Sequence, residues 1–167
     1  MDLLEGIATR RSIRKYTDRP VTREQLREIL RLGTMAPSGL NNQPWRFVTI
    51  QQQTMLQELA ALTKYGRIIE NASACIAVFI DTEAMYHEVK DHQSMGACIQ
   101  NLLLAAHGMG LGAVWLGEIL KNAKPVAELC GLAERYELMA VVALGYAAGQ
   151  GGRADRWPLD EVVLKEL

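Results

Sequence analysis

The sequence lacks the features that identify several large classes of protein. No stretch approaches the roughly 18 consecutive apolar residues of a membrane-spanning helix, so no transmembrane segment is expected. The first five residues lack the basic and apolar regions of a signal peptide, and we therefore expect a cytoplasmic protein. The formal net charge at pH 7 is -1, which gives no field that would favour nucleic acid or an anionic membrane.

Cysteine and histidine are scarce, which removes most disulfide and metal chemistry. Cys75, Cys98 and Cys130 are odd in number and far apart, so they form neither a disulfide framework nor a CxxC pair. We interpret them as buried apolar thiols. His87 and His92 do not have the i, i+4 spacing that places two metal ligands on one helix face, and no metal site is predicted.

Known catalytic motifs are also absent. The sequence contains neither a GxSxG nucleophile elbow nor a P-loop. The glycines of residues 108–112 resemble a dinucleotide fingerprint, but they follow a helix and precede a strand, which is the reverse of the required order. We predict no catalytic side chain, and if the chain is an enzyme its reactivity is expected to come from a cofactor.

What remains is the pattern of one folded domain spanning residues 1–167. Of these residues 49% are hydrophobic and 22% are charged, which is typical of globular proteins. Apolar periodicity predicts helices over 2–9, 23–35, 54–63, 83–107 and 123–130, and strands over 46–50, 74–80, 112–116 and 137–144. This irregular mixture favours an α+β fold with a mixed, largely antiparallel central sheet flanked by helices.

Three of the predicted helices have distinctive features. Thr22, with Gln25 three residues later, has the pattern of a capping box, and Asn122 is predicted to cap a helix that Gly131 ends. The segment 83–107 is apolar on most of its faces. A helix of this kind is expected to be buried in a core or in an interface between subunits.

Basic side chains gather at the end of the first predicted helix. Arg10, Arg11, Ser12 and Arg14 place three guanidiniums and a hydroxyl within five residues. Arginine offers paired donors to phosphate oxygens and serine adds one more, so the cluster suits a phosphate group. Taken alone, the cluster also fits a solvated basic turn, which is the more ordinary arrangement.

Three further segments have features of a ligand site. Residues 36–45 concentrate amides and hydroxyls between two prolines, which suits the edge of a flat heterocycle but also a surface loop anchored by Trp45. The glycines of residues 110–118 allow a ligand to approach the backbone closely. Arg153 and Arg156 add cations to an extended tail.

Together these segments resemble the nitroreductase family of FMN-dependent oxidoreductases. The shared pattern is R-R-S-x-R, then P-S-x-x-N-x-Q-P-W, then a long apolar helix ending in G-x-G-L-G, and finally L-G-Y with a tail arginine near R-x-P. These parts correspond to Arg10–Arg14, Pro37–Trp45, Gln100–Gly112 and Leu144–Pro158. The match spans nearly the whole chain in the same order, and its proline-bounded segment is fairly specific.

The resemblance implies an intertwined homodimer with two FMN sites at its interface and a C-terminal tail that extends to the partner subunit. The residues that would hold the FMN phosphate and ribityl chain are Arg10, Arg11, Ser12, Arg14, Arg156 and, as a weaker candidate, Arg153. The residues that would reach the isoalloxazine of the partner's site are Pro37, Ser38, Gly39 and Asn41. Leu116 and Gly117 would lie along the flavin, with the Gly117 N–H near flavin N5.

The reaction that the resemblance implies is a ping-pong transfer of two electrons from NAD(P)H to a small acceptor, such as a nitroaromatic or a quinone. Two alternatives stay open. One is a related flavoprotein with other redox chemistry, such as dehydrogenation or reductive dehalogenation. The other is a non-enzymatic dimer that binds FMN.

The chain departs from the family pattern in two places. Few residues lie between the strand that ends near Asp81 and the long helix, and the family's flavin-facing Asn and Lys have no clear counterpart over 63–70. We therefore expect an open flavin face with a low rim formed by residues 82–91. Tyr86 is the candidate rim contact, although a plain surface tyrosine is the simpler interpretation.

Overall fold

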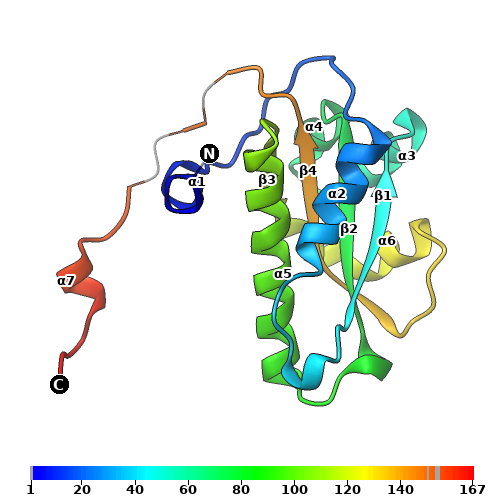
Figure 1. Cartoon of the computed structure of the whole chain (residues 1–167). Helices are drawn as coiled ribbons and strands as arrows, with labels where there is room; N and C mark the ends of the chain where they lie inside the picture. The colour runs from blue at the N-terminus through cyan, green and yellow to red at the C-terminus, as the bar shows by residue number, and fades with distance from the viewer. Residues whose placement is uncertain (1, 150, 153–154) are drawn as a thin grey trace.

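The computed structural model describes residues 2–149, 151–152 and 155–167 (Figure 1). Its helices are α1 (Leu3–Thr9), α2 (Arg23–Gly33), α3 (Gln53–Ala60), α4 (Gly66–Glu70), α5 (Glu88–Gly108), α6 (Ala123–Leu129) and α7 (Leu159–Val162). Its strands are β1 (Trp45–Ile50), β2 (Ala74–Asp81), β3 (Gly112–Leu116) and β4 (Tyr136–Gly145). Its short 3-10 turns are η1 (Gly39–Asn41), η2 (Thr82–Ala84) and η3 (Glu118–Asn122).

The strands form one sheet in the order β1-β2-β4-β3, and each pair of neighbours is antiparallel. β2 pairs with β1 on one side and with β4 on the other, so it is central and buried along its whole length. The predicted α+β fold with a largely antiparallel sheet is confirmed. Among the described residues, parallel pairing is confined to the isolated bridge between Ser12 and Ala113.

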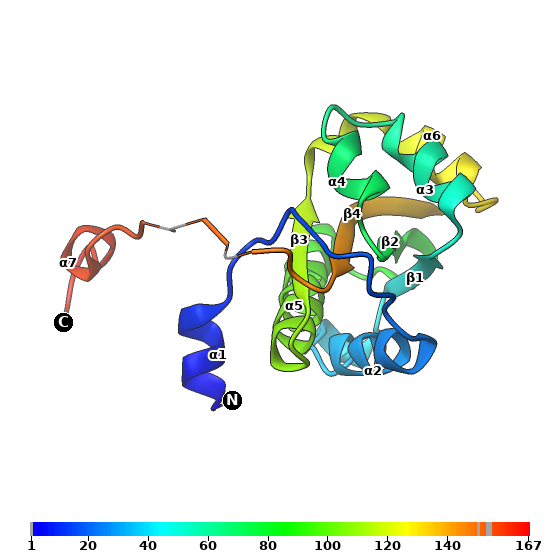
Figure 2. The same ribbon diagram turned by 90° about the horizontal axis from the view of Figure 1, so that it is seen from above.

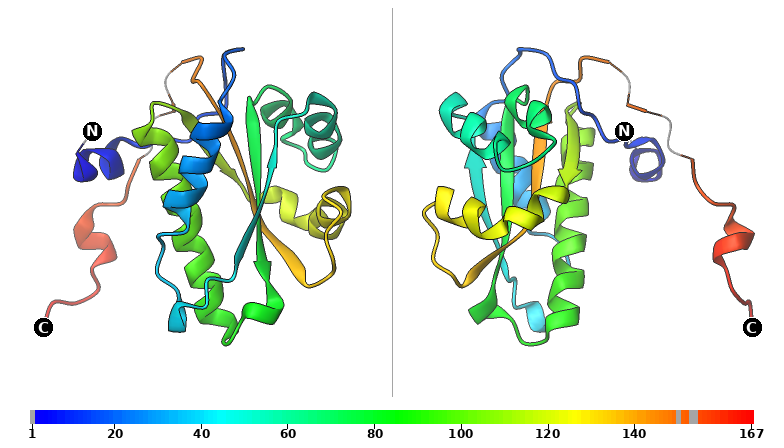
Figure 3. Two further views of the ribbon diagram at one scale, coloured as in Figure 1. Left: turned by 45° about the vertical axis from the view of Figure 1, so that its right-hand side comes forward. Right: turned by 180° about the vertical axis from the view of Figure 1, so that it is seen from behind.

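Helices cover both faces of this sheet (Figures 2 and 3). Successive side chains of a strand point to opposite faces. Ile76 and Val78 of β2 accordingly pack in the core cluster with α2 and α5, whereas Cys75, Ala77 and Phe79 pack in the cluster with α3, α4 and α6. Burial on both faces explains why β2 is a continuous apolar run rather than an alternating one.

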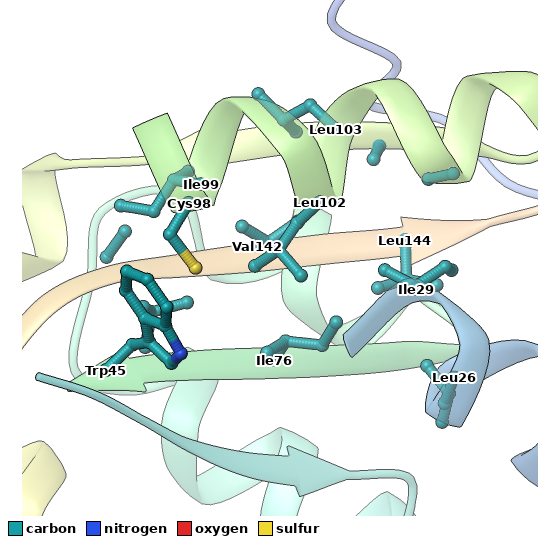
Figure 4. Close-up of a cluster of buried hydrophobic side chains, with 14 of the residues drawn as sticks. Leu26, Ile29, Trp45, Ile76, Cys98, Ile99, Leu102, Leu103, Val142 and Leu144 are labelled. Carbon is teal, nitrogen blue, oxygen red and sulfur yellow. The ribbon is translucent and has the colours of Figure 1, made fainter. Parts of the chain in front are cut away.

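The layer between α2, α5 and the sheet fixes the position of the long helix. Figure 4 shows Ile29 of α2, Leu102 of α5, and Ile76 and Val142 of the sheet within one cluster of buried side chains. A Cβ at Gly33 would overlap the Leu102 side chain, so the glycine lets α2 approach α5 closely. Burying each such aliphatic side chain contributes about 1.5–3 kcal/mol. This layer therefore holds α5 rigidly along the sheet.

The ends of two helices test the predicted capping signals. The capping box at Thr22 is confirmed, because Thr22 and Gln25 exchange reciprocal hydrogen bonds between side chain and backbone. Asn122 occupies the predicted N-cap position of α6, but the capping interaction itself is absent. Its side chain makes no capping hydrogen bond and donates instead to the Leu62 carbonyl over 2.7 Å. Gly131 does follow the helix in the left-handed conformation expected of a terminating glycine, with φ 66°.

Two other differences concern helix extent. The long helix α5 begins at Glu88 rather than near residue 83, because residues 82–84 form η2 and His87 caps the helix by accepting from the Lys90 N–H. The short helix α4 was not expected. It has five residues, too few to show a helical period in sequence.

Both ends of the chain project from the layered body, α1 on one side and residues 155–167 beyond it (Figures 1 and 2). Their exposed apolar side chains are Leu3, Leu4, Ile7, Trp157, Leu159, Val162, Val163, Leu164 and Leu167. Apolar groups gathered on projecting segments are typical of surfaces that another chain covers. Within the described ranges, no helix has the length and apolar character needed to cross a membrane.

Candidate functional site

The basic segment that follows α1 runs beside the edge strand β3. The Ile13 N–H donates to the Ala113 carbonyl over 3.0 Å, and Ser12 forms the parallel bridge to the same residue. Successive side chains in extended backbone point to opposite sides. The sheet edge therefore places Ser12 and Arg14 on one side of the segment and Ile13 on the other.

Three cavities border this segment. Arg11 and Ile13 line a cavity of about 720 Å³ together with His107 of α5. Ser12 and Arg14 line a second cavity of about 320 Å³, whose opposite wall is formed by glycines of the tail. Arg14 also lines a third cavity of about 240 Å³ at the end of β3. Arg11, Ser12 and Arg14 thus face concave surface rather than a plain solvated turn, whereas Arg10 and Arg156 line none of these three cavities.

The third cavity brings two sets of predicted residues together, because Arg14 lies there with Leu116 and Gly117. Its other lining residues are Tyr65, Ile68, Val114 and Trp115. Sequence reasoning did not identify Tyr65 and Trp115, whose exposed fractions are 44% and 41%. Large aromatic side chains that stay exposed beside an exposed glycine could have been a signal, but exposure is not readable from the sequence.

Three arginines of the predicted phosphate group influence one another through their charge. Burial, then the charge of Arg156 and then that of Arg11, lower the pKa of the Arg10 guanidinium. Among the described residues none of the three forms an ion pair with a carboxylate. Cations held together without a counter-charge suit an anionic ligand. The predicted contribution of Arg153 lies outside the described residues.

Glu118, immediately after Gly117, links this end of β3 to the chain between α3 and α4. Its carboxylate accepts from the Thr63 hydroxyl over 2.6 Å and from the Lys64 N–H over 3.3 Å, and it pairs with Lys121. The Lys121 contact and then the Thr63 hydrogen bond lower the pKa of Glu118 to about 2. The charged carboxylate therefore holds Tyr65, two residues after Thr63, against the third cavity.

The predicted flavin-facing loop has a structure of its own. The Ser38 hydroxyl accepts from the Gln43 N–H over 3.1 Å, which closes the loop over residues 38–43. A Cβ at Gly39 would overlap the Tyr86 hydroxyl, so Tyr86 packs directly on this glycine. Tyr86 remains 42% exposed. The candidate rim residue thus lies on the loop that was predicted to reach a flavin.

The two predicted halves of the site lie far apart within one chain. The loop over residues 37–41 contacts the first turns of α5, whereas Arg11 shares a cavity with His107 in its last turn. Figure 1 shows η1 and α1 at opposite ends of α5. A helix of 21 residues is about 30 Å long. A single chain therefore does not bring both halves to one ligand.

Comparison with known proteins identifies the family. The sequence profile described as the Nitroreductase family matches residues 7–65 and 53–146, and this chain belongs to that family. A protein from Archaeoglobus fulgidus named as an NADH dehydrogenase/NAD(P)H nitroreductase is 38% identical over 148 residues, which cover 87% of this chain and 85% of that protein. A protein of the same name from Methanothermobacter thermautotrophicus is 34% identical over 168 residues, 99% of this chain and 88% of that protein.

Solved structures show the same relationship. A crystal structure of a nitroreductase in complex with FMN from Desulfovibrio desulfuricans has a TM-score of 0.96 and 48% sequence identity, and the match covers 100% of this chain and 98% of that one. The NADPH:FMN oxidoreductase from Vibrio harveyi complexed with NAD+ has a TM-score of 0.88 and 30% identity, covering 98% of this chain and 76% of that one. The resemblance inferred from the sequence motifs is confirmed at the level of family and fold.

Proposed function

We propose that this protein is an FMN-dependent NAD(P)H oxidoreductase that works as a homodimer and passes two electrons to a small acceptor, a nitroaromatic, a quinone or a related compound, by a ping-pong mechanism. The observation that carries the proposal is the cavity at the end of β3, where Arg14 meets Leu116 and the exposed Gly117. The FMN complex of the 48% identical relative supports the same cofactor.

The donor set of the site fits FMN. Arg10, Arg11 and Arg156 would bind the phosphate, because they form a group of cations without carboxylate partners among the described residues. Ser12 and Arg14, on the same side of the segment beside β3, would hold the ribityl chain and lead to the third cavity. FMN, when bound, supplies the two-electron chemistry that the side chains of this protein lack.

The ring end of the cofactor would need both subunits. Leu116 and Gly117 would lie along the ring from one subunit, while Pro37, Ser38, Gly39 and Asn41 would approach it from the partner. The position of these two groups at opposite edges of the sheet supports this arrangement, because the loop leads into β1 while Leu116 ends β3, and β2 and β4 lie between those strands. The exposed apolar side chains of α1 and the tail give the two subunits further surface to bury.

An anaerobic titration tests the proposal. The protein is purified, saturated with FMN, and followed by its visible flavin absorbance while NADH or NADPH is added, after which nitroaromatic and quinone acceptors are supplied. We expect NAD(P)H to bleach the flavin bands and an acceptor to restore them. Absence of FMN binding would overturn the whole proposal. FMN binding without bleaching by either nucleotide would favour the non-enzymatic FMN-binding dimer instead.

A further inference from the structure

A buried carboxylate in the first turn of α5 is not used by the phosphate or ring contacts described above. Asp91 is fully buried. One of its oxygens accepts from the backbone N–H groups of Tyr86 and His87 over 2.9 and 2.8 Å, and the other accepts from Asn42 Nδ2 over 2.6 Å. Burial raises the pKa of this carboxyl, but the hydrogen bonds from His87, Asn42 and Tyr86 outweigh burial and leave the pKa below its usual value.

The Asn42 side chain is held in one orientation by this carboxylate. Its Nδ2 donates both to Asp91 and to the Ala84 carbonyl, the latter over 3.0 Å. Its Oδ1 is buried and finds no donor among the described residues. Reversing the amide would place that oxygen against two acceptors. Asp91 therefore ties Asn42 to the segment before α5 with a fixed geometry.

Asn42 lies within a strained stretch of backbone. Leu40, Asn41 and Gln43 have φ values of 54°, 54° and 47°, which is the left-handed region that side chains other than glycine rarely adopt. Residues in this conformation persist only where surrounding contacts fix it. The hydrogen bond from Asn42 to a buried charge is the contact that joins the middle of this stretch to the helix layer.

Asp91 also fixes the position of Tyr86, which packs on the loop. By accepting the N–H groups of Tyr86 and His87, it sets the path of the chain that enters α5. That path places the Tyr86 ring on Gly39, where any larger residue would overlap its hydroxyl. One carboxylate thus contacts both parts of this region. It binds the Ser38–Gln43 loop through the Asn42 side chain and the exposed Tyr86 through its backbone N–H.

We propose that Asp91 is a positioning residue of the redox site, which locks the strained Ser38–Gln43 loop and Tyr86 into one arrangement at the edge where the acceptor enters. This inference rests on the proposed function, because it takes the loop to face the flavin of the partner subunit. Tyr86 is then the group that touches the acceptor, and Asp91 acts through it. No chemical step is assigned to the carboxylate itself.

Asparagine at position 91 cannot replace the aspartate. Its single oxygen could accept from Tyr86 and His87, but its amide nitrogen would then face Asn42 Nδ2, donor against donor. Turning Asn42 to relieve this clash would oppose its oxygen to the Ala84 carbonyl. Asp91→Asn keeps the size of the side chain and removes the connection between loop and helix. Ser94→Ala is a matched control, because Ser94 is also buried on α5 and, among the described residues, its side chain bonds only to the Lys90 carbonyl of its own helix.

The first experiment is amide hydrogen exchange on the purified full-length chain, which needs no flavin. The readout is the Asn41, Asn42 and Gln43 amides, whose bonds close the loop, with the β2 amides as the internal measure of global unfolding. Asp91→Asn should accelerate exchange in the loop by about tenfold or more, the size expected when hydrogen bonds to a buried charge are lost. Ser94→Ala should leave loop exchange unchanged.

The second readout is kinetic, on the FMN-loaded dimer. Asp91→Asn should raise the KM of a quinone acceptor by more than it lowers the rate at which NAD(P)H reduces the flavin. Tyr86→Ala should reproduce the KM effect without accelerating loop exchange, because the Asp91–Asn42 bond remains. Failure of the wild-type protein to bind FMN would overturn the proposed function. The hydrogen-exchange measurement would still test independently whether Asp91 holds the loop.

Two outcomes would overturn the inference. One is loop exchange in Asp91→Asn that stays within about twofold of wild type, or that rises only in parallel with β2. The other is an unchanged acceptor KM in a variant whose loop has been released. If Asp91→Asn does not fold, Asn42→Ala takes its place. That variant should release the loop while the Tyr86 and His87 amides stay protected, and unchanged loop exchange there would also contradict the proposal.

Discussion

Arg10 is the residue whose removal tests the phosphate site most directly. Arg10→Ala should weaken FMN binding about ten- to a hundredfold, because a hydrogen bond to a charged group is worth roughly 1.5–3 kcal/mol. Ser12→Ala should weaken it in the same direction. The measurement is a fluorescence titration of the FMN-free protein with FMN. Arg27→Ala is the control, since Arg27 is an exposed arginine of α2 outside the predicted site. Unchanged affinity in Arg10→Ala would remove Arg10 from the site.

The histidines are expected to be dispensable for the chemical step. His87 caps α5, His92 bonds to the Glu88 carbonyl in its own helix, and His107 lies 2.9 Å from the Thr9 hydroxyl, so each has a structural partner. The triple variant His87→Asn, His92→Gln, His107→Gln should keep at least about a tenth of the rate of flavin reduction by NAD(P)H, measured by stopped flow at saturating FMN. General acid–base catalysis contributes about a hundredfold or more. A loss beyond about a thousandfold would therefore show a histidine acting on the substrate.

At the residue scale, the sequence predicts local chemistry better than long-range partners. The capping box at Thr22 involves residues three apart, and the structure confirms it. Asn122 is of a residue type that commonly caps helices, but its side chain donates a hydrogen bond to the Leu62 carbonyl, 60 positions away. Likewise, Tyr65 and Trp115 become neighbours of Arg14 only through the packing of three separate elements. Partners of this kind depend on tertiary distance, which no spacing in one sequence records.

At the scale of elements, Glu118 joins the end of β3 to the chain before α4, and its ionisation should make that connection depend on pH. Its pKa is lowered from 4.5 to about 2, so the carboxylate stabilises the fold above pH 4.5, and this stabilisation is lost as pH falls toward 2. Glu118→Gln should therefore lower the urea midpoint at pH 7 and show a smaller further loss than wild type between pH 4.5 and pH 2.

The matched control for Glu118 is Glu58→Gln, which removes an exposed carboxylate of α3 that has no ion pair among the described residues. It should leave the difference between neutral and acid stability close to that of wild type. Equal acid sensitivity in wild type and Glu118→Gln would show that the contacts of Glu118 with Thr63 and Lys121 do not stabilise the charged form.

Element positions could be predicted where period and length are clear. The continuous apolar run of β2 and the long apolar helix α5 are confirmed, since burial on two faces or on most faces leaves a strong compositional pattern. The start of α5 could not be placed, because Asp81 caps η2 and because Asp91, which accepts the His87 N–H, is itself held by Asn42 of a distant segment. α4 is too short to produce a period.

At the scale of the whole molecule, we expect an obligate homodimer. α1 and the tail expose a row of apolar side chains, among them Trp157 and Leu164, which are 77% and 97% exposed in one chain. Leu164→Asp should weaken dimerisation, whereas Lys165→Asp, an exposed charge change at the next position, should weaken it less. Sedimentation equilibrium at micromolar concentration measures both. A stable FMN-loaded monomer of the wild-type protein would contradict the two-subunit site.

The last prediction concerns how selective the whole dimer is toward acceptors. The connection between β2 and α5 contains only residues 82–87, half of them in η2, and Tyr86 is its one aromatic contact with the Ser38–Gln43 loop. Six residues can form a rim but not a lid, and apolar pockets discriminate by only a few kcal/mol even when they are closed. We therefore expect broad acceptor use, weak substrate binding and some electron transfer to oxygen. The measurement is a kinetic panel of quinones and nitroaromatics of varied shape, with oxygen consumption followed in parallel. A preference above roughly a thousandfold for one acceptor, combined with a KM in the low micromolar range, would require specific contacts to hydrogen-bonding groups rather than stacking at an open edge.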